Sequence, residues 1–257
     1  MSPRIAFVLG GVQKGGTTAL ASFIAQHPGV RLPAGKEAHV FDAADFDDGW
    51  DAGGVDARYA AHFPDGMGTG MAQADALYGD ATPIYCLHPR LVGRIARYNP
   101  AMRWILILRH PVERAISQYR MERGRGDERW PLWRAALFER WRLAGHEDDF
   151  SATSPLRHAS YLQRGDYARQ LDVLYAHFPR EQVLVLRNEE LAASPHAVLE
   201  RVWAFLGLPA PAVAPVFSRV FEGSQGPLPR TTPVWRLLSL LLAGRMRQAA
   251  ERYGIHW

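Results

Sequence analysis

The feature that most constrains the fold is the glycine-rich stretch GGVQKGGTTAL, which covers residues 10–20. It follows the apolar run Ile5–Leu9, typical of a buried strand, and leads into a segment whose apolar residues recur at helical spacing. A strand, a glycine loop and a helix in that order predict a phosphate cradle, because loop amides and the positive end of the helix converge on one anion. The predicted binding residues are Lys14, Gly15, Gly16, Thr17 and Thr18.

The lysine of this loop stands too early for a nucleoside triphosphate site. A nucleotide P-loop needs Lys directly before Ser or Thr, whereas here Gly16 holds that position and Lys14 precedes it by two residues. A P-loop small-molecule kinase with Mg²⁺ is therefore an alternative that Gly16 argues against. A nucleotide-binding module without catalysis is a second alternative.

The rest of the chain alternates apolar strands with amphipathic helices, which predicts an α/β protein with a central parallel sheet flanked by helices in three layers. We expect a single domain over residues 1–257, with the ligand beyond the carboxyl ends of the strands, where residues 10–18 and 109–117 fall. Residues 42–56 are predicted to form an exposed, solvated loop because they are rich in Asp and Gly. The predicted strands are Ile5–Leu9, Val30–Leu32, Trp104–Leu108 and Gln182–Arg187, and the predicted helices are 17–26, 90–97, 111 onward, 130–143, 161–178 and 195–206.

A second candidate site is the stretch RHPVERAISQY, which covers residues 109–119. Arg109 ends a predicted strand and Ser117 lies about two turns into the next helix, so both side chains can face one pocket. A permanently charged guanidinium and a hydroxyl suit a second phosphate. An ordinary surface arginine is the alternative.

A third candidate site is the stretch KEAHVFD, which covers residues 36–42. Glu37 and His39 are two residues apart, so an extended segment would point both side chains to the same side. A carboxylate beside an imidazole can remove a proton from a hydroxyl or an amine. A surface pair without catalytic function is the alternative.

Composition narrows the class of protein. Hydrophobic residues are 47% and charged residues 22% of the 257, which predicts a soluble globular protein, and the net charge of +4 comes without a basic tract, so nucleic acid is not indicated. The apolar runs are too short for a membrane span, and the single cysteine, Cys86, favours a reducing compartment; we therefore expect a cytoplasmic protein. Of the 30 basic residues, two are lysines, Lys14 and Lys36, and both lie in candidate sites.

Together these stretches resemble the sulfotransferases that use 3′-phosphoadenosine 5′-phosphosulfate (PAPS), in particular the heparan sulfate type, with its glucosaminyl 3-O-sulfotransferases and their bacterial relatives. VQKGGTTAL resembles that family's 5′-phosphosulfate loop, EAHVFD its Glu-x-His-Phe-Phe-Asp segment, and WILILRHPVERAISQY its 3′-phosphate motif. GDATPIY resembles its Glu-Lys-Thr-Pro-x-Tyr segment, and residues 160–179 and 182–191 resemble its long helix and last strand.

The resemblance implies transfer of a sulfuryl group to a hydroxyl, with an amine as second choice, on a small molecule or a carbohydrate. It implies PAPS as donor, adenosine 3′,5′-bisphosphate (PAP) as product and no metal. Lys14 would stabilise the leaving phosphate, and Glu37 would be the base, with His39 as a second candidate for base or for orienting the acceptor. The 5′-phosphate would be held by the glycine loop with Thr17 and Thr18, and the 3′-phosphate by Arg109 and Ser117.

The chain departs from that family at two places. At the first, Asp80 and Ala81 replace the Glu-Lys pair of Glu-Lys-Thr-Pro, which removes a cation near the acceptor. At the second, Gln225-Gly226-Pro227 replaces the Lys-Gly-Arg loop over the donor, and Arg230 is a candidate substitute for the lost charge. These changes leave donor binding expected but speak against a heparan-like acceptor. Residues 42–85 and 124–160 are expected to contact the acceptor. Candidates to line an aromatic acceptor cleft are Trp50, Trp130, Trp133 and Trp141, with a place in a helix core as the favoured alternative for the last three. A core position is also favoured for Tyr167. Neither the acceptor nor the oligomeric state is indicated.

Overall fold

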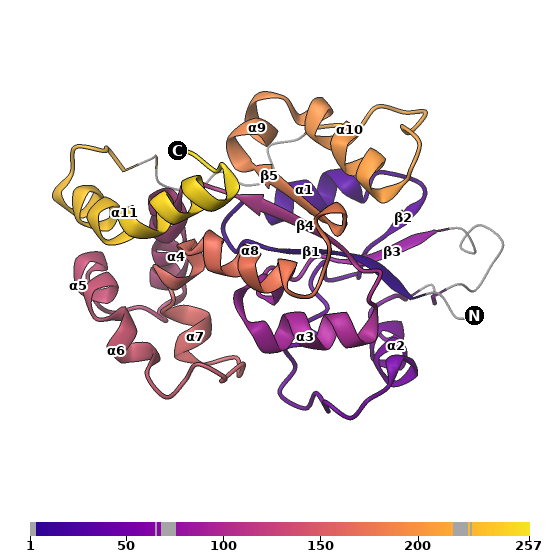
Figure 1. Ribbon diagram of the computed structural model, residues 1–257, viewed down its shortest axis with the longest axis horizontal. Coiled ribbons are helices and arrows are strands. Elements are labelled where there is room, and N and C mark those ends of the chain that lie inside the picture. Colours follow the sequence, from indigo (N-terminus) through magenta and orange to yellow (C-terminus); the bar gives the residue numbers. More distant parts are fainter. Residues whose placement is uncertain (1–3, 65, 68–75, 218–225, 227) are drawn as a thin grey trace. The chain divides into compact units, whose positions relative to one another are not determined.

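The computed structural model describes residues 4–64, 66–67, 76–217, 226 and 228–257 (Figure 1). The chain divides into two compact units. The first unit comprises residues 1–108 and 173–221, and the second comprises residues 109–172 and 222–257. The predicted single domain over the whole chain therefore stays a prediction.

The first unit contains a five-stranded sheet in which every strand pair is parallel, in the order β2-β3-β1-β4-β5. The first strand along the chain is central, so the loop that follows it leaves the middle of the sheet. This sheet confirms the predicted α/β class. The strands are β1 (Ile5–Gly11), β2 (Val30–Arg31), β3 (Leu77–Asp80), β4 (Arg103–Leu108) and β5 (Val183–Arg187).

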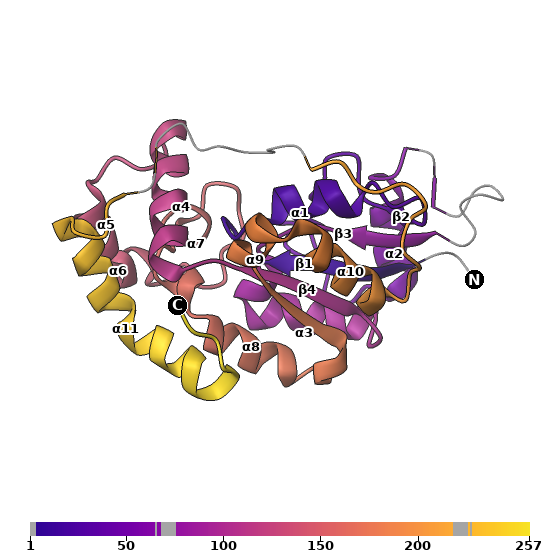
Figure 2. The same cartoon turned by 90° about the horizontal axis from the view of Figure 1, so that it is seen from above.

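Helices cover both faces of this sheet (Figures 1 and 2). One face carries α1 (Thr17–Ile24), α9 (Asn188–Ala193) and α10 (Pro195–Leu206), and the other carries α2 (Ala52–Ala60) and α3 (Pro89–Tyr98). Short 3₁₀ turns lie at Tyr85–Leu87 (η1) and Arg180–Gln182 (η3). Apolar residues of β1, β4, α1 and α10 form one buried cluster, which includes Phe7, Leu20, Ile105 and Val202. Burial of these side chains joins the helices to the sheet and gives the predicted three layers.

The second unit is helical. Its helices are α4 (Pro111–Arg125), α5 (Leu132–Leu137), α6 (Glu139–Leu143), α7 (Pro155–His158), the 3₁₀ turn η2 (Gln163–Gly165) and α11 (Pro233–Tyr253). The boundary between the units falls inside α8 (Tyr167–Tyr175). Val112 and Ile116 of α4 are buried in one cluster with Leu238 and Leu242 of α11. The last helix therefore packs against α4 and forms part of the core of this unit.

The predicted loop over residues 42–56 is partly wrong, because α2 begins at Ala52. The Asp51 side chain accepts a hydrogen bond from Gly54 N–H at 2.8 Å and so caps this helix, which outweighs the low helix propensity of its two glycines. Asp48 is not simply solvated either: it accepts from Arg90, Arg94 and Arg97 of α3, and this pairing holds its pKa far below the usual range.

The long helix predicted over residues 130–143 is two short helices with a break at Phe138. Trp133 is 46% exposed and Trp141 is 71% exposed, so the expected core positions of these two residues are wrong. Trp130 is half-buried and contacts the guanidinium groups of Arg134 and Arg142, whose central carbon atoms are 4.3 and 5.0 Å from its ring centroid. Tyr167 is buried, as expected.

Candidate active site

The glycine loop lies where the sheet places it, at the carboxyl end of the central strand β1. Val12 N–H donates to Ile107 C=O at 3.2 Å, and Gly15 N–H donates back to Val12 C=O at 2.8 Å. A Cβ atom at Gly15 would come within 2.1 Å of the Ile107 carbonyl oxygen, so only glycine lets the loop pack this closely on β4.

The glycine loop leads directly into the N-terminus of α1, and in the described part of the chain no side chain hydrogen-bonds to the first backbone amides of this helix. Gly16 is the N-cap residue, in the left-handed region at φ 111°. Thr17 is buried and Thr18 is exposed. Free amides at a helix N-terminus attract an anion, so the geometry suits the predicted phosphate cradle.

Asn188, the first residue of α9, is a neighbour of the loop that no sequence motif indicated. A Cβ atom at Gly16 would lie 2.5 Å from its Nδ2 atom, so the amide of Asn188 stands directly against the start of α1. Asn188 follows β5, two strands away from β1, and the only available signal was a polar residue directly after a predicted strand.

Three residues other than glycine adopt positive φ among the described residues: Lys14 at 67°, Lys36 at 70° and His39 at 53°. Such a backbone costs free energy for a residue with a Cβ atom and tends to persist at functional sites. All three belong to the stretches that the sequence singled out, and two of them are the only lysines of the chain.

Glu37 lies at the centre of a small charged group. Its Oε1 atom is 2.5 Å from Lys36 Nζ, and its Oε2 atom is 3.1 Å from His39 Nε2. The other ring nitrogen of His39 is 2.8 Å from Oδ2 of the buried Asp42. The predicted meeting of Glu37 and His39 is confirmed, but the extended segment expected to produce it is wrong, since His39 has a left-handed backbone.

The charges of this group are set by its hydrogen bonds. Burial acts to lower the pKa of His39, but the hydrogen bonds to Asp42 and Glu37 outweigh it and raise the pKa to about 9. Burial acts to raise the pKa of Glu37, and the hydrogen bond from His39 and the charge of Lys36 together hold it below its usual value. At neutral pH the group therefore contains an ionised Glu37 and a protonated His39.

The segment that carries Glu37 lies at the same edge of the sheet as the glycine loop. Ala81, directly after β3, donates its N–H to Lys36 C=O at 3.2 Å, and β3 is the parallel neighbour of β1. A Cβ atom at Gly11, the end of β1, would come within 2.2 Å of Cys86 Sγ, so the residues after β3 pack against the end of β1. Ala81, where the resembling family has lysine, thus has Lys36 as its backbone neighbour.

Arg109 and Ser117 belong to the second unit. Both are half-buried, and the carbonyl of Arg109 accepts a hydrogen bond from the buried Tyr167 hydroxyl at 2.8 Å. Arg109 Nε is 3.5 Å from Glu113, one turn further on. The glycine loop belongs to the first unit, so a ligand shared by this loop, Arg109 and Ser117 stays a prediction. Of the predicted cover over the donor, Gln225 and Pro227 lie outside the described residues, and Arg230 stacks on Trp235 at 5.6 Å.

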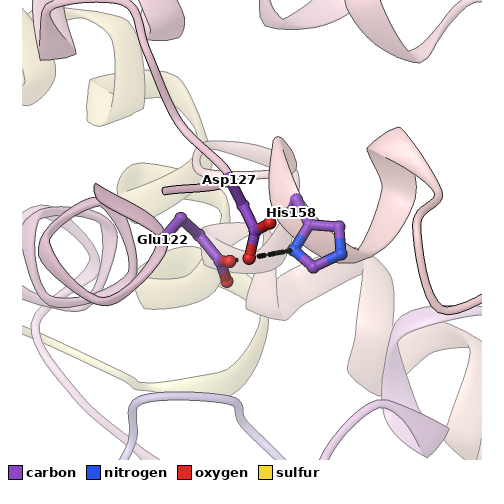
Figure 3. A group of neighbouring side chains, drawn as sticks. All are labelled: Glu122, Asp127 and His158. Carbon is purple, nitrogen blue, oxygen red and sulfur yellow. Dashed lines mark hydrogen bonds and ion pairs between the residues drawn. The ribbon is translucent and has the colours of Figure 1, made fainter. Parts of the chain in front are cut away.

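Among the described residues, one group has ligand atoms close enough to share a metal ion: Glu122, Asp127 and His158 (Figure 3). His158 Nδ1 is 2.9 Å from a carboxylate oxygen of the buried Glu122 and 3.7 Å from Asp127, and its Nε2 is 2.6 Å from Ala152 C=O. Burial acts to lower the pKa of His158, but these acceptors outweigh it and raise the pKa. Acceptors at both ring nitrogens fit a protonated imidazole. A protonated His158 therefore explains the arrangement of these three side chains without a metal ion.

The second unit has an open hollow of about 780 Å³ beside this group. Trp141, Arg142, His146 and His158 are among the side chains that line it. The hollow contains none of the residues predicted to bind the donor.

A parallel sheet whose central strand leads through a glycine loop into a helix with no side-chain cap defines an α/β protein with a P-loop-like fold. Within that class the chain belongs to the Sulfotransferase family, whose pattern matches residues 6–212. Among the described residues, no helix has the length and apolar character to cross a bilayer.

Known proteins resemble the chain in sequence and in structure. It is 33% identical over 198 residues to the human heparan sulfate glucosamine 3-O-sulfotransferase 3B1, a match that covers 77% of this chain and 45% of that protein. The chain spans about half the length of the curated relatives it matches. The crystal structure of a sulfotransferase from Alicyclobacillus acidocaldarius superposes with a TM-score of 0.75 at 25% identity, covering 99% of this chain and 97% of that one. The sulfotransferase domain of the curacin biosynthetic pathway, at 18% identity and a TM-score of 0.53, shares the fold.

Proposed function

We propose that this protein transfers the sulfuryl group of PAPS to a hydroxyl group of a carbohydrate or small-molecule acceptor and releases PAP. An amine is the second choice of acceptor. The observation that carries the proposal is the placement of an ionised Glu37 at the same sheet edge as the glycine loop, in a chain of the Sulfotransferase family.

The glycine loop is the proposed site of the 5′-phosphosulfate. Backbone amides of Gly15 and Gly16, with the hydroxyls of Thr17 and Thr18, would hold the phosphate at the N-terminus of α1. Lys14 would neutralise the charge that grows on the bridging oxygen as that oxygen leaves the sulfur. Arg109 and Ser117 would hold the 3′-phosphate, and an arginine suits this task because it stays charged and can donate two hydrogen bonds.

Glu37 is the proposed general base. The acceptor hydroxyl attacks sulfur and passes its proton to Glu37, while the bond from sulfur to the bridging oxygen breaks and its electron pair leaves with PAP. His39 is unsuited to the role of base because it is protonated at neutral pH. As a cation it would orient the Glu37 carboxylate and the acceptor. No step of this scheme is routed through a metal ion.

The nature of the acceptor is proposed only at the level of a hydroxyl group. We infer that Lys36, whose carbonyl accepts a hydrogen bond from Ala81 N–H, takes over the part of the lysine that the resembling family has at the position of Ala81. The hollow lined by Trp141 and Arg142 supports residues 124–160 as a further contact region. The single cysteine, Cys86, is buried and supports a cytoplasmic location, and the Alicyclobacillus structure supports a bacterial type of enzyme. Nucleic acid and membranes are not proposed as partners.

The test is transfer of radioactive sulfur from [³⁵S]PAPS to three acceptor probes: heparan sulfate, N-acetylglucosamine oligosaccharides and p-nitrophenol. We expect labelled product from at least one probe and an equal amount of PAP, with no label transferred by Lys14→Ala. Tight binding of PAP without transfer to any probe would instead support the non-catalytic nucleotide-binding module.

A further inference from the structure

Asp80 is a fully buried carboxylate that the proposed reaction does not use. It ends β3, and none of its side chain is exposed. Its Oδ1 atom accepts from Ala38 N–H at 3.1 Å and from the Thr82 hydroxyl at 2.7 Å. Its Oδ2 atom accepts from the hydroxyls of Tyr59 at 2.9 Å and Tyr85 at 2.8 Å.

The donors around Asp80 connect it to three consecutive backbone amides. Ala38 N–H binds Asp80 directly. His39 N–H donates to the Thr82 hydroxyl at 3.3 Å, and Val40 N–H donates to the Tyr85 hydroxyl at 3.1 Å. Each of these hydroxyls in turn donates to Asp80, so the carboxylate fixes the segment that carries Glu37 and His39.

We propose that Asp80 is a positioning residue, whose hydrogen-bonded network holds residues 38–40 so that His39 can bridge Glu37 and Asp42. This inference rests on the proposed role of Glu37 as base.

The backbone of this segment gives the network a specific task. His39 has φ 53°, a conformation that an unrestrained residue leaves readily because it crowds the Cβ atom. In this conformation its two ring nitrogens reach Glu37 at 3.1 Å and Asp42 at 2.8 Å. Four hydrogen bonds to one carboxylate, two of them relayed to amides, oppose the relaxation of the loop.

Burial explains why a carboxylate is used. Burial raises the pKa of Asp80, and hydrogen bonds from Thr82, Tyr85, Ala38 and Tyr59 oppose this by stabilising the charge. A carboxylate offers two oxygens that only accept, so a single residue can gather four donors. A neutral residue of similar size lacks that capacity.

The test uses Asp80→Ala, with Tyr59→Phe as the matched control. Tyr59→Phe removes one donor to Asp80 but leaves every link to residues 38–40 in place. Thr82→Val is the second variant, because it removes only the link to His39 N–H and one donor while keeping the side-chain shape. Thr82→Val therefore decides the question if Asp80→Ala does not fold.

The first readout needs no acceptor: the pKa of the His39 imidazole, followed by ¹⁵N NMR and assigned with His39→Gln. Glu37 and Asp42 are charged groups that face this ring, and the ammonium of Lys36 contacts Glu37. We expect the pKa of about 9 to fall by about one unit or more in Asp80→Ala and Thr82→Val, a tenfold loss of proton affinity, and to stay in Tyr59→Phe.

The second readout is catalysis. With [³⁵S]PAPS and the acceptor probes heparan sulfate and p-nitrophenol, we expect kcat to fall about tenfold or more in both variants, while the affinity for PAP stays within about twofold. An unchanged His39 pKa in both variants overturns the inference, as does a lowered pKa with unchanged kcat. If the unaltered protein transfers no sulfur, the proposed function fails, and the His39 titration still decides whether Asp80 positions this segment.

Discussion

Lys36 Nζ lies 2.5 Å from one carboxylate oxygen of Glu37, and His39 Nε2 lies 3.1 Å from the other. Both contacts hold the pKa of Glu37 below its usual value. Removing the ammonium in Lys36→Met should therefore raise the pKa of Glu37 and move the acid limb of the pH profile of kcat/KM to higher pH. Lys36→Arg keeps the charge and should keep the profile near that of the unaltered protein. If the acid limb does not move in Lys36→Met, the charge of Lys36 does not set the pKa of the base.

Glu37→Gln should abolish proton transfer without emptying the donor site. The amide cannot accept the acceptor proton, so we expect transfer to fall by about 10²–10⁴-fold, the usual contribution of a general base. Binding of PAP, measured by calorimetry, should stay within about twofold because the glycine loop is unchanged. Full turnover by Glu37→Gln would remove this residue from the mechanism.

Gly16→Ala should weaken both folding and donor binding. The residue has φ 111°, and an added Cβ would meet the Asn188 amide at 2.5 Å, so we expect a loss of about 1–2 kcal/mol in the free energy of unfolding and weaker binding of PAP. Gly124→Ala is the control: Gly124 lies in α4 with open space around it, and the change should stabilise the helix by up to about 1 kcal/mol. Chemical denaturation measures both. Equal stability of the two variants would contradict the left-handed assignment.

Arg109→Ala should lower the affinity for one nucleotide and leave the affinity for a second, related nucleotide nearly unchanged. Loss of the charged donor to the 3′-phosphate should weaken the binding of PAP by about tenfold or more. Binding of adenosine 5′-phosphosulfate, which lacks that phosphate, should barely change. Arg140→Ala, at an exposed position on α6, should change neither. A similar loss for both ligands would contradict the 3′-phosphate assignment.

The stability of the protein should depend on the protonation of His39. Its pKa is raised to about 9, above the unfolded value near 6.5, so the stability from its protonation is fully present below pH 6.5 and is lost as pH rises through 9. The difference in unfolding free energy between the unaltered protein and His39→Gln should therefore shrink from pH 6.5 to pH 9. Urea denaturation at several pH values measures this difference, and a constant value would show that the ion pairs of His39 do not stabilise the fold.

Local patterns in the sequence were sufficient for the core of the sheet. The strands near Ile5, Trp104 and Val183 and the helix from Pro195 to Leu206 are close to the predicted ranges, because continuous apolar runs and a proline at the helix start are local signals. The helix α11 was missed because its apolar residues pack on α4, more than 100 positions earlier in the chain, and local patterns do not reveal such pairing.

The site shows the same division between local and distant signals. Gly16 and the pairing of Glu37 with His39 follow from short motifs. The position of Asn188 beside Gly16, and the hydrogen bond of Ala38 to Asp80, depend on which strands become neighbours in the sheet. Asp80 was noted only as a departure from a family pattern, since its role depends on donors as distant in sequence as Tyr59 and Ala38.

We infer that the early lysine, Lys14, belongs to a loop shaped for a phosphosulfate rather than a triphosphate. The most direct test is a thermal-shift comparison of PAP with ATP and Mg²⁺, for the unaltered protein and for Lys14→Ala, because a ligand that binds only the native state raises the melting temperature. We predict a clear rise with PAP that is reduced in Lys14→Ala, and no comparable rise with ATP and Mg²⁺. A rise that requires ATP and Mg²⁺, with none from PAP, would contradict the account and support the kinase alternative.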